Sequence, residues 1–293
     1  MKNKLMTAFG GIPFTPPGRW LKAVIILIII VPLQISKAQT GSIIITIENN
    51  AGTITRQIDS SVYSSIWNFN KTSTGWTSTI NYTVSAPCPG TPTVYYAGQT
   101  YHTVQIGSQC WLVENINAGT MINGSQSQKN NGIIEKYCFN NDSANCAVYG
   151  GLYEWAEAVQ YQNGATNTDT ANSPFIKNVQ GICPGGWHIP TYYELDTLAA
   201  AVNQNGNALK AIGQTAQTGG AGTNTSGFSA LFAGSDDNAD VFYLQGYFTD
   251  FWSSTESSAK GACIMHLIYY NSLPTFGCDF PKADAFSVRC VKD

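Results

Sequence analysis

The chain has 293 residues, of which only 11% are charged, and its 15 Lys and Arg against 18 Asp and Glu give a formal net charge of −3. Five of the basic residues and none of the acidic ones lie in residues 1–38, so the rest of the chain carries 10 against 18, a net charge of −8. An acidic surface repels phosphate backbones, which argues against nucleic acid as a partner.

Residues 1–38 have the pattern of a secretory signal peptide. Basic residues precede an unbroken apolar run over residues 23–31, and small residues stand before a cleavage site at Ala38. The run is shorter than the roughly 20 residues that a membrane span needs, and no Cys follows the site to carry a lipid. We predict cleavage after Ala38, so that any membrane link is through the signal or surface anchoring. An uncleaved N-terminal anchor is the alternative.

Residues 39–86 are predicted to form a β-rich N-terminal segment. Runs with β-type composition at residues 42–47 and 79–84 are separated by stretches rich in Asn, Ser and Thr. Pro and Gly are concentrated in residues 86–92, which predicts a boundary there and a main domain over residues 87–293. About 200 residues are enough for one compact domain.

Two helices are predicted in the main domain. In residues 151–159 the apolar side chains have the spacing of one helix face: Leu152, Trp155, Ala156 and Val159. The second helix begins at a capping box, in which Thr191 and Glu194 satisfy free N–H groups of the first turn. Its buried stripe is expected to be Leu195, Leu198, Ala199 and Val202. Beyond residue 203 long polar loops are expected until two strand-like runs, at residues 262–270 and 285–291.

Six sequence phrases occur in one order between residue 101 and residue 293. They are YHTVQIGSQCWLVENI (101–116), YGGLYEW (149–155), CPGGWHIP (183–190), GFSAL (227–231), FWSSTE (251–256) and FSVRCVKD (286–293). Together they closely resemble the Fibrobacter succinogenes major paralogous domain family, over about residues 94–293. That family is similar to the formylglycine-generating-enzyme-like branch of the C-type lectin fold, in which a helix begins with a phrase like PTYYE (190–194).

The resemblance implies an α+β, C-type-lectin-like domain with two helices, a small twisted antiparallel sheet and long loops. A strand over residues 286–291 would close the sheet. It also implies a secreted or surface protein of the kind found in Bacteroidetes and Fibrobacteres. A bond between Cys183 and Cys290 is similar to the long-range disulfide of C-type lectin domains. The usual lectin sugar motifs, Glu-Pro-Asn and Trp-Asn-Asp, are absent from the sequence.

Eight cysteines, all after residue 38, predict an oxidising compartment and disulfides. Their spacings match no common zinc pattern, and the three histidines are scattered at His102, His188 and His266. The other expected bonds are Cys138–Cys146 around a turn-rich segment, Cys263–Cys278 flanking a hairpin and, for the remaining two, Cys88–Cys110. An open redox pair at Cys263 and Cys278 is the alternative for the second of these.

Candidate ligand contacts are aromatic residues of the loops expected at about residues 205–250 and 266–282, because a rigid scaffold lets loops vary. They are Tyr243, Tyr247, Tyr269, Tyr270 and Phe276. Three tryptophans in the family phrases are expected to pack in the core: Trp111, Trp187 and Trp252. Oxygen ligands that Ca²⁺ accepts lie in one short run: Asp236, Asn238 and Asp240. A solvated turn is favoured there, because the Gly and bidentate Glu of an EF-hand are missing.

No catalytic constellation stands out, since neither a Gly-x-Ser-x-Gly elbow nor a His-Glu-x-x-His motif occurs. We therefore expect no enzymatic activity, no metal and no cofactor. The prediction is a secreted or cell-surface recognition or adhesion module that binds a glycan, a wall component or a protein. The alternative is a structural surface protein that self-associates through its β-rich segment. A weaker alternative is a formylglycine-generating-enzyme-like catalyst, which needs a free thiol.

Overall fold

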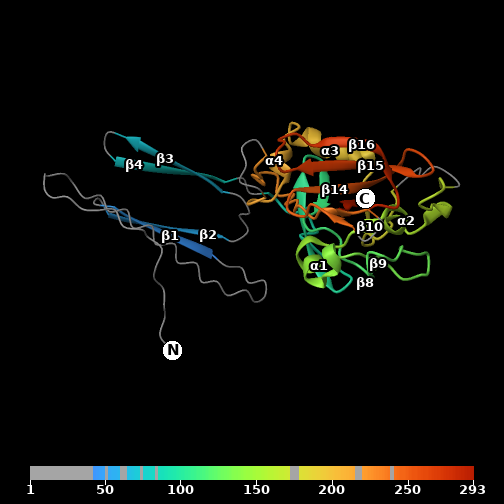
Figure 1. Ribbon diagram of the computed structural model, residues 1–293. Helices are drawn as coiled ribbons and strands as arrows, with labels where there is room; N and C mark the ends of the chain where they lie inside the picture. Colours follow the sequence, from blue (N-terminus) through green and yellow to red (C-terminus); the bar gives the residue numbers. More distant parts are fainter. Residues whose placement is uncertain are drawn as a thin grey trace, which may run out of the picture. The chain divides into compact units, whose positions relative to one another are not determined.

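The structure is a computed structural model that describes four N-terminal strands and most of residues 85–293 (Figure 1). The described ranges are 42–49, 52–59, 65–72, 75–82, 85–171, 178–214, 220–237 and 241–293. The chain divides into two units, residues 1–60 and 61–293. The predicted signal peptide lies outside the described residues, and the boundary predicted between residues 86 and 87 stays a prediction.

The four N-terminal strands form two antiparallel hairpins. β1 (Ser42–Asn49) pairs with β2 (Gly52–Asp59), and β3 (Ser65–Thr72) pairs with β4 (Gly75–Tyr82). Each strand has eight residues and one partner among the described strands. The segment is therefore β-rich, as its composition predicts.

A five-stranded antiparallel sheet joins the start of the main domain to its last residues. The strand order is β11 (Trp187–His188), β18 (Val291–Lys292), β7 (Gln109–Leu112), β6 (Gln99–Ile106) and β5 (Thr93–Tyr96). Val291 pairs with His188 on one side and with Trp111 on the other, so β18 lies between β11 and β7. The single strand predicted over residues 285–291 is divided into β17 (Ala285–Phe286) and β18.

A three-stranded antiparallel sheet carries the longest pairing of the main domain. Its strands, in order, are β14 (Phe248–Glu256), β15 (Gly261–Ile268) and β16 (Thr275–Pro281). β15 was expected from its apolar run. β14 lies where long loops were predicted. The strand was not predicted because the Thr, Asp and Ser residues in FTDFWSSTE interrupt the apolar pattern of a strand.

Alternating side chains of β15 separate two hydrophobic cores. Ala262 and Ile264 belong to the first core, and Met265 and Leu267 to the second. The tryptophans of the family phrases are buried as expected. Trp187 and Trp252 lie in the first core and Trp111 in the second.

Two smaller sheets complete the unit. One has the order β10 (Tyr153–Glu154), β17, β12 (Ser235–Asp236) and β13 (Phe242–Tyr243). The other is a parallel pair, β8 (Thr120–Met121) and β9 (Glu135–Lys136).

The described helices are short. They are α1 (Ser143–Tyr149), α2 (Trp155–Ala158), α3 (Tyr192–Ala201) and α4 (Gly206–Leu209), with single 3₁₀ turns at η1 (Phe139–Asn141) and η2 (Gln162–Gly164). The class is α+β as predicted, with four α-helices where two were expected. The capping box is confirmed, since Thr191 Oγ1 accepts from Glu194 N and Glu194 Oε2 accepts from Thr191 N.

The helix predicted over residues 151–159 is wrong in extent. Tyr153 and Glu154 pair with Phe286 and Ala285 in the antiparallel sheet, and only the four residues of α2 turn helically. The four apolar side chains of the pattern are buried in the core as expected. They lie in or next to a short strand and a single helical turn rather than on one continuous helix.

The last residue of the chain is tied to the start of α3 by a buried histidine. His188 Nδ1 lies 2.7 Å from Asp293 Oδ1, and His188 Nε2 lies 2.9 Å from Glu194 Oε1. Burial lowers the pKa of His188, but the two carboxylates outweigh it and raise the pKa above its ordinary value. The His188 ring therefore connects β11, the capping box of α3 and the residue that follows β18.

Candidate binding site

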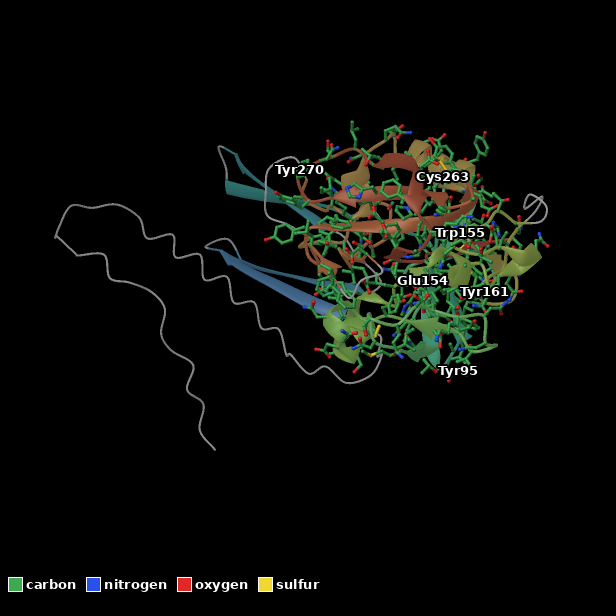
Figure 2. The ribbon with its side chains drawn as sticks, turned by 45° about the vertical axis from the view of Figure 1, so that its right-hand side comes forward. Tyr95, Glu154, Trp155, Tyr161, Cys263 and Tyr270 are labelled. Carbon is green, nitrogen blue, oxygen red and sulfur yellow. A yellow bond between two sulfur atoms is a disulfide. The ribbon has the colours of Figure 1, made fainter. Side chains whose placement is uncertain are left out.

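Three tyrosine side chains meet where β14 begins and β15 ends. The ring of Tyr269 lies edge-on to the rings of Tyr247 and Tyr270, with centroid distances of 5.3 and 5.0 Å. Tyr247 is 50% exposed and Tyr270 58%, whereas Tyr269 is partly buried against the second core. We call these three residues the tyrosine cluster. Figure 2 shows Tyr270 at the periphery of the unit.

Backbone hydrogen bonds hold the strand ends that carry the cluster. Tyr269 N donates to the carbonyl of Tyr247 at 2.8 Å, which continues the β14–β15 ladder past its last regular pair. Gly246 N donates to the carbonyl of Phe232 at 2.8 Å, and Tyr247 N donates to that of Leu244 at 3.0 Å. The cluster is therefore built on paired backbone.

A buried lysine clamps the turn that follows β15. The Lys210 ammonium donates to the carbonyls of Ile268 (2.7 Å), Asn271 (2.5 Å) and Gly220 (3.1 Å), and to Asn207 Oδ1 (3.1 Å). Among the described residues no carboxylate forms an ion pair with it. Burial lowers the pKa of Lys210 to about 8. The buried ammonium thus binds oxygen atoms of separate loops and fixes the position of the turn that follows β15.

The close approach of Gly220 to this turn leaves no space for a side chain. A Cβ atom at Gly220 would collide with the carbonyl group of Tyr269 and meet the backbone nitrogen of Tyr270. Any larger residue at position 220 must therefore displace the turn or its own loop.

The other side of the same hairpin end carries a histidine–aspartate pair. His266 and Asp250 are opposite each other in the β14–β15 register, and His266 Nδ1 lies 2.5 Å from Asp250 Oδ1. Burial raises the pKa of Asp250, and the interaction with His266 opposes that shift. With Nδ1 directed at the carboxylate, Nε2 is the ring nitrogen left for another partner. The ring of Phe248 lies against the imidazole at 5.4 Å.

Two predicted ligand contacts lie apart from the tyrosine cluster. Tyr243, in β13, donates its hydroxyl to Asp237 Oδ2 at 3.0 Å. Phe276, in β16, has its ring 5.7 Å from that of Tyr192, at the start of α3. The structure thus brings together three of the five candidate residues.

The candidate calcium ligands do not form a site within the described residues. Asp236 is buried in β12, so the solvated turn that the sequence favoured is wrong at this residue. Asn238 and Asp240 lie outside the described residues. Nearby, burial and the charges of Asp237 and Asp250 raise the pKa of Asp284 to about 6. Within the described ranges no group of three His, Cys, Asp or Glu is arranged to hold a metal ion.

All eight cysteines are paired. The bonds are Cys88–Cys110, Cys138–Cys146, Cys183–Cys290 and Cys263–Cys278. The Cys183–Cys290 bond is buried, whereas Cys278 is exposed on β16. Four disulfides indicate a compartment outside the reducing cytoplasm. In the part of the chain that is described, no helix has the length and apolar character to cross a membrane.

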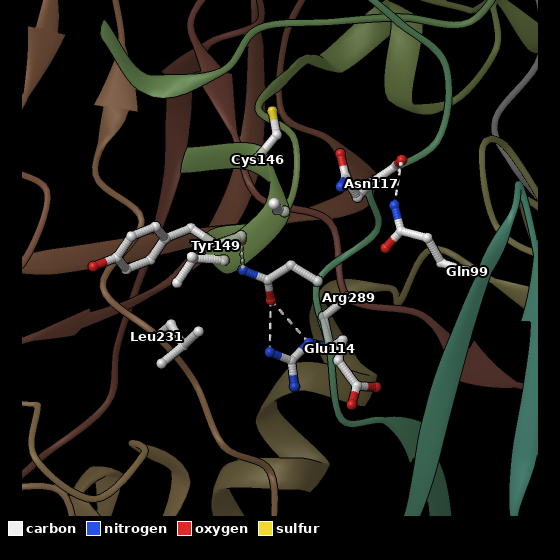
Figure 3. Close-up of a pocket in the computed structure, with 11 residues that line it drawn as sticks. Gln99, Glu114, Asn117, Cys146, Tyr149, Leu231 and Arg289 are labelled. Carbon is white, nitrogen blue, oxygen red and sulfur yellow. Dashed lines mark hydrogen bonds between the residues drawn. The ribbon is translucent and has the colours of Figure 1, made fainter. Parts of the chain in front are cut away.

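A cavity of about 70 Å³ lies between α1 and the chain that follows β7 (Figure 3). Arg289 lines it, buried, with Nε and Nη2 donating to Asn115 Oδ1 at 3.0 and 2.6 Å and Nη1 donating to the carbonyls of Leu112 and Phe228. Its guanidinium lies 4.4 Å from the ring centre of Phe228. Burial lowers the pKa of Arg289 to about 9. These contacts give Arg289 a structural role, because each of its three nitrogens is already bonded to protein.

Two buried carboxyl groups were missed by sequence reasoning. Glu154 Oε1 accepts from the Tyr137 hydroxyl at 2.6 Å, and Glu157 Oε1 accepts from Glu135 N at 3.0 Å. Burial raises the pKa of both carboxyl groups. Figure 2 places Glu154 within the body of the unit, apart from Tyr270. The signal was present in YEWAEA, where two acids stand three residues apart in an otherwise apolar stretch.

The fold and site define a disulfide-linked α+β domain with a clamped aromatic turn. Residues 104–292 match the Fibrobacter succinogenes major domain, and the chain belongs to that family. No curated protein and no solved structure matches the chain.

Proposed function

We propose that this protein is a non-catalytic recognition module that binds a neutral glycan outside the cytoplasm. The exposed rings of the tyrosine cluster support this proposal, because phenol faces pack against sugar rings and phenol hydroxyls form hydrogen bonds. Because Lys210 fixes the turn in the free protein, less conformational entropy of the turn is lost when a ligand binds. The acidic chain repels anionic polymers, which favours a neutral ligand.

Exposed apolar side chains are concentrated in the stretch of sequence that contains the tyrosine cluster. Of the eleven large apolar side chains that are exposed in the described ranges, six come from residues 241–273. They are Val241, Tyr243, Leu244, Tyr247, Tyr270 and Leu273. Of these six, Tyr247 and Tyr270 lie together in the tyrosine cluster, and exposed apolar groups that gather on a surface mark interaction sites.

Affinity electrophoresis through gels that contain neutral glucans, mannans or xylans tests the proposal. We expect at least one polymer to slow the protein, and Tyr270→Ala to weaken that interaction about tenfold, a loss of about 1.4 kcal/mol. Tyr95→Ala is the matched control, because Tyr95 is 77% exposed and lies well away from Tyr270 (Figure 2). Circular dichroism checks that both variants fold.

If no neutral polymer slows the protein, or if both variants lose equal affinity, glycan recognition by the tyrosine cluster is wrong. Retention only in gels with an anionic polymer would contradict the expected ligand charge.

We also propose that the protein is secreted or displayed on the outer cell surface. The four disulfides and the signal pattern of residues 1–38 support this location. N-terminal sequencing of protein recovered outside the cell is expected to begin at Gln39. An intact N-terminus in the membrane fraction would favour the uncleaved anchor.

The finer fold assignment, a C-type-lectin-like domain, is likewise proposed. It is supported by the capped helix α3, the place of β18 between β11 and β7 and the bond between Cys183 and Cys290. An experimental structure whose strand connections differ from those of C-type lectins would overturn it.

Self-association through the N-terminal hairpins is a second candidate function. Each strand of β1–β2 and β3–β4 has one partner among the described strands, and unpaired strand edges are templates for pairing with another chain. Light scattering is expected to show particles that grow with concentration, that persist in Tyr270→Ala and that diminish in Thr46→Pro, which removes a ladder donor from β1. A monomer at all concentrations would contradict this function.

A further inference from the structure

The cavity shown in Figure 3 is bordered by a buried cation that no carboxylate pairs with. The cation is Arg289, which is 1% exposed and forms no ion pair within the described ranges. Carbonyl groups and the face of Phe228 stabilise part of its charge. Charges are nevertheless rarely buried without a counter-ion, because removing an ion from water costs free energy. The proposed function makes no use of this cavity.

A second cation acts on the cavity through Asn117. The Lys136 ammonium donates to Asn117 Oδ1 at 2.6 Å and to the Asn117 carbonyl at 2.9 Å, and in the described part of the chain Lys136 has no carboxylate partner either. Asn117 lines the cavity and is 9% exposed. Its Oδ1 is occupied by Lys136, whereas its Nδ2 has no hydrogen-bond partner among the described residues. The amide therefore has two N–H donors available at the cavity wall.

Other lining side chains also have N–H groups available. Arg289 Nη2 carries two N–H groups and donates to one acceptor, Asn115 Oδ1. Gln99 Nε2 likewise donates to one acceptor, the carbonyl of Asn117, at 3.3 Å. The wall of the cavity thus offers hydrogen-bond donors from three side chains that it brings together.

One carboxylate lines the cavity, and a histidine binds it. Glu114 Oε2 accepts from His102 N at 2.7 Å, and Glu114 Oε1 lies 2.7 Å from His102 Nδ1. The two unpaired cations beside the cavity, Arg289 and Lys136, outnumber this carboxylate. The surroundings of the cavity are therefore positive in a chain whose net charge is negative.

From these contacts we propose that the cavity binds a single halide-sized anion, such as chloride, through the amide of Asn117 and the guanidinium of Arg289. Its volume of about 70 Å³ is several times the roughly 10–15 Å³ that one water molecule needs, so an ion slightly larger than water fits. The anion balances the buried guanidinium. It also connects the chain that follows β7 to the chain between β17 and β18, where Asn117 and Arg289 lie.

Thermal unfolding in sodium chloride and in sodium gluconate at equal ionic strength tests the proposal, because gluconate is too large for the cavity. We expect chloride to raise the midpoint by about 2–4 °C over gluconate, with saturation as its concentration rises. Asn117→Asp should remove this shift, because it places a carboxylate at the anion site and still accepts from Lys136. Asn123→Asp is the matched control for general salt effects, because Asn123 is exposed and does not line the cavity.

Crystals of the unmodified protein grown in sodium bromide give a direct measurement. We expect an anomalous diffraction peak in the cavity, within hydrogen-bond distance of Asn117 Nδ2. Bromide found on the surface alone would overturn the proposal, and so would equal chloride shifts in Asn117→Asp and Asn123→Asp. Glycan binding by the tyrosine cluster is tested separately and does not depend on either result.

Discussion

Two regions of the domain are held in place by different interactions. One is β18, which completes the five-stranded sheet and is called the closing strand below, and the other is the turn that carries the tyrosine cluster. The closing strand is fixed by a buried disulfide and by His188 between two carboxylates. The turn is fixed by one ammonium group and backbone carbonyls. Substitutions that remove the contacts of the first should unfold the domain. Substitutions that remove the contacts of the second should make the turn more mobile and leave the fold intact.

The largest expected effect is loss of the closing disulfide. Replacing Cys183 and Cys290 by Ser should lower the free energy of unfolding by about 2–5 kcal/mol, because the bond closes a long loop. The residues it joins are 107 apart in the sequence. Denaturant unfolding followed by tryptophan fluorescence measures the loss.

The Cys263–Cys278 bond provides the matched control, since its residues are 15 apart. Its removal by the same substitutions should cost roughly 1–2 kcal/mol less in the chain-entropy account. Equal losses would contradict the view that the closing strand depends on the long-range bond.

The next effect is smaller and local. Lys210→Met should lower the free energy of unfolding by about 1–3 kcal/mol, because buried carbonyls lose their donor. Hydrogen exchange should accelerate at residues 268–273 and stay unchanged at residues 183–190. In the same variant, the affinity for the proposed glycan should decrease as residues 268–273 lose their protection from hydrogen exchange.

Lys292→Met is the control for that substitution. Lys292 is partly buried, and its ammonium donates to Thr91 Oγ1 at 2.8 Å, away from the tyrosine cluster. Equal acceleration of exchange at residues 268–273 in both variants would remove the special role of Lys210.

The smallest effect is a pH dependence at the closing strand. Because the pKa of His188 is raised, its contribution is full below its ordinary value of 6.5 and is lost as the pH rises through the folded value. Burial opposes the ionised form of Glu194, but its hydrogen bonds with His188 and Thr191 lower its pKa below 4.5, so its contribution is lost as the pH falls through the folded value.

Stability from this pair should therefore be greatest between about pH 4.5 and 6.5. Its size should be about 1 kcal/mol or less, because Asp293 is half-exposed and screened by solvent. Thermal unfolding of the parent and of His188→Gln across pH 4 to 9 measures it. An unchanged slope above pH 6.5 in the variant would contradict the assignment.

Features that depend only on residues close together in the sequence could be predicted. The capping box of Thr191 and Glu194 is such a feature, and so are the apolar run of β15 and the tyrosines that face solvent. The family match over residues 104–292 is shown independently of the structure.

Features that depend on distant partners could not be predicted. Lys210 binds carbonyls that are 10, 58 and 61 residues away, and a carbonyl acceptor has no side-chain signature. β14 was not predicted because its sequence contains polar residues, and these residues are buried through contacts with residues distant in the sequence. The helix over residues 151–159 was predicted from a pattern that the pairing of Tyr153 with Phe286 overrides.

The position of β18 between β11 and β7 also bears on the order of folding. β7 ends at Leu112 and gains its second neighbour only when Val291 arrives, so the sheet depends on contacts of very high sequence separation, which slow folding. β7 and β11 have no shared neighbour in the sheet until residue 291 has been synthesised. A chain that stops before residue 291 would leave the edge of β7 that β18 covers open, and open strand edges favour aggregation and proteolysis.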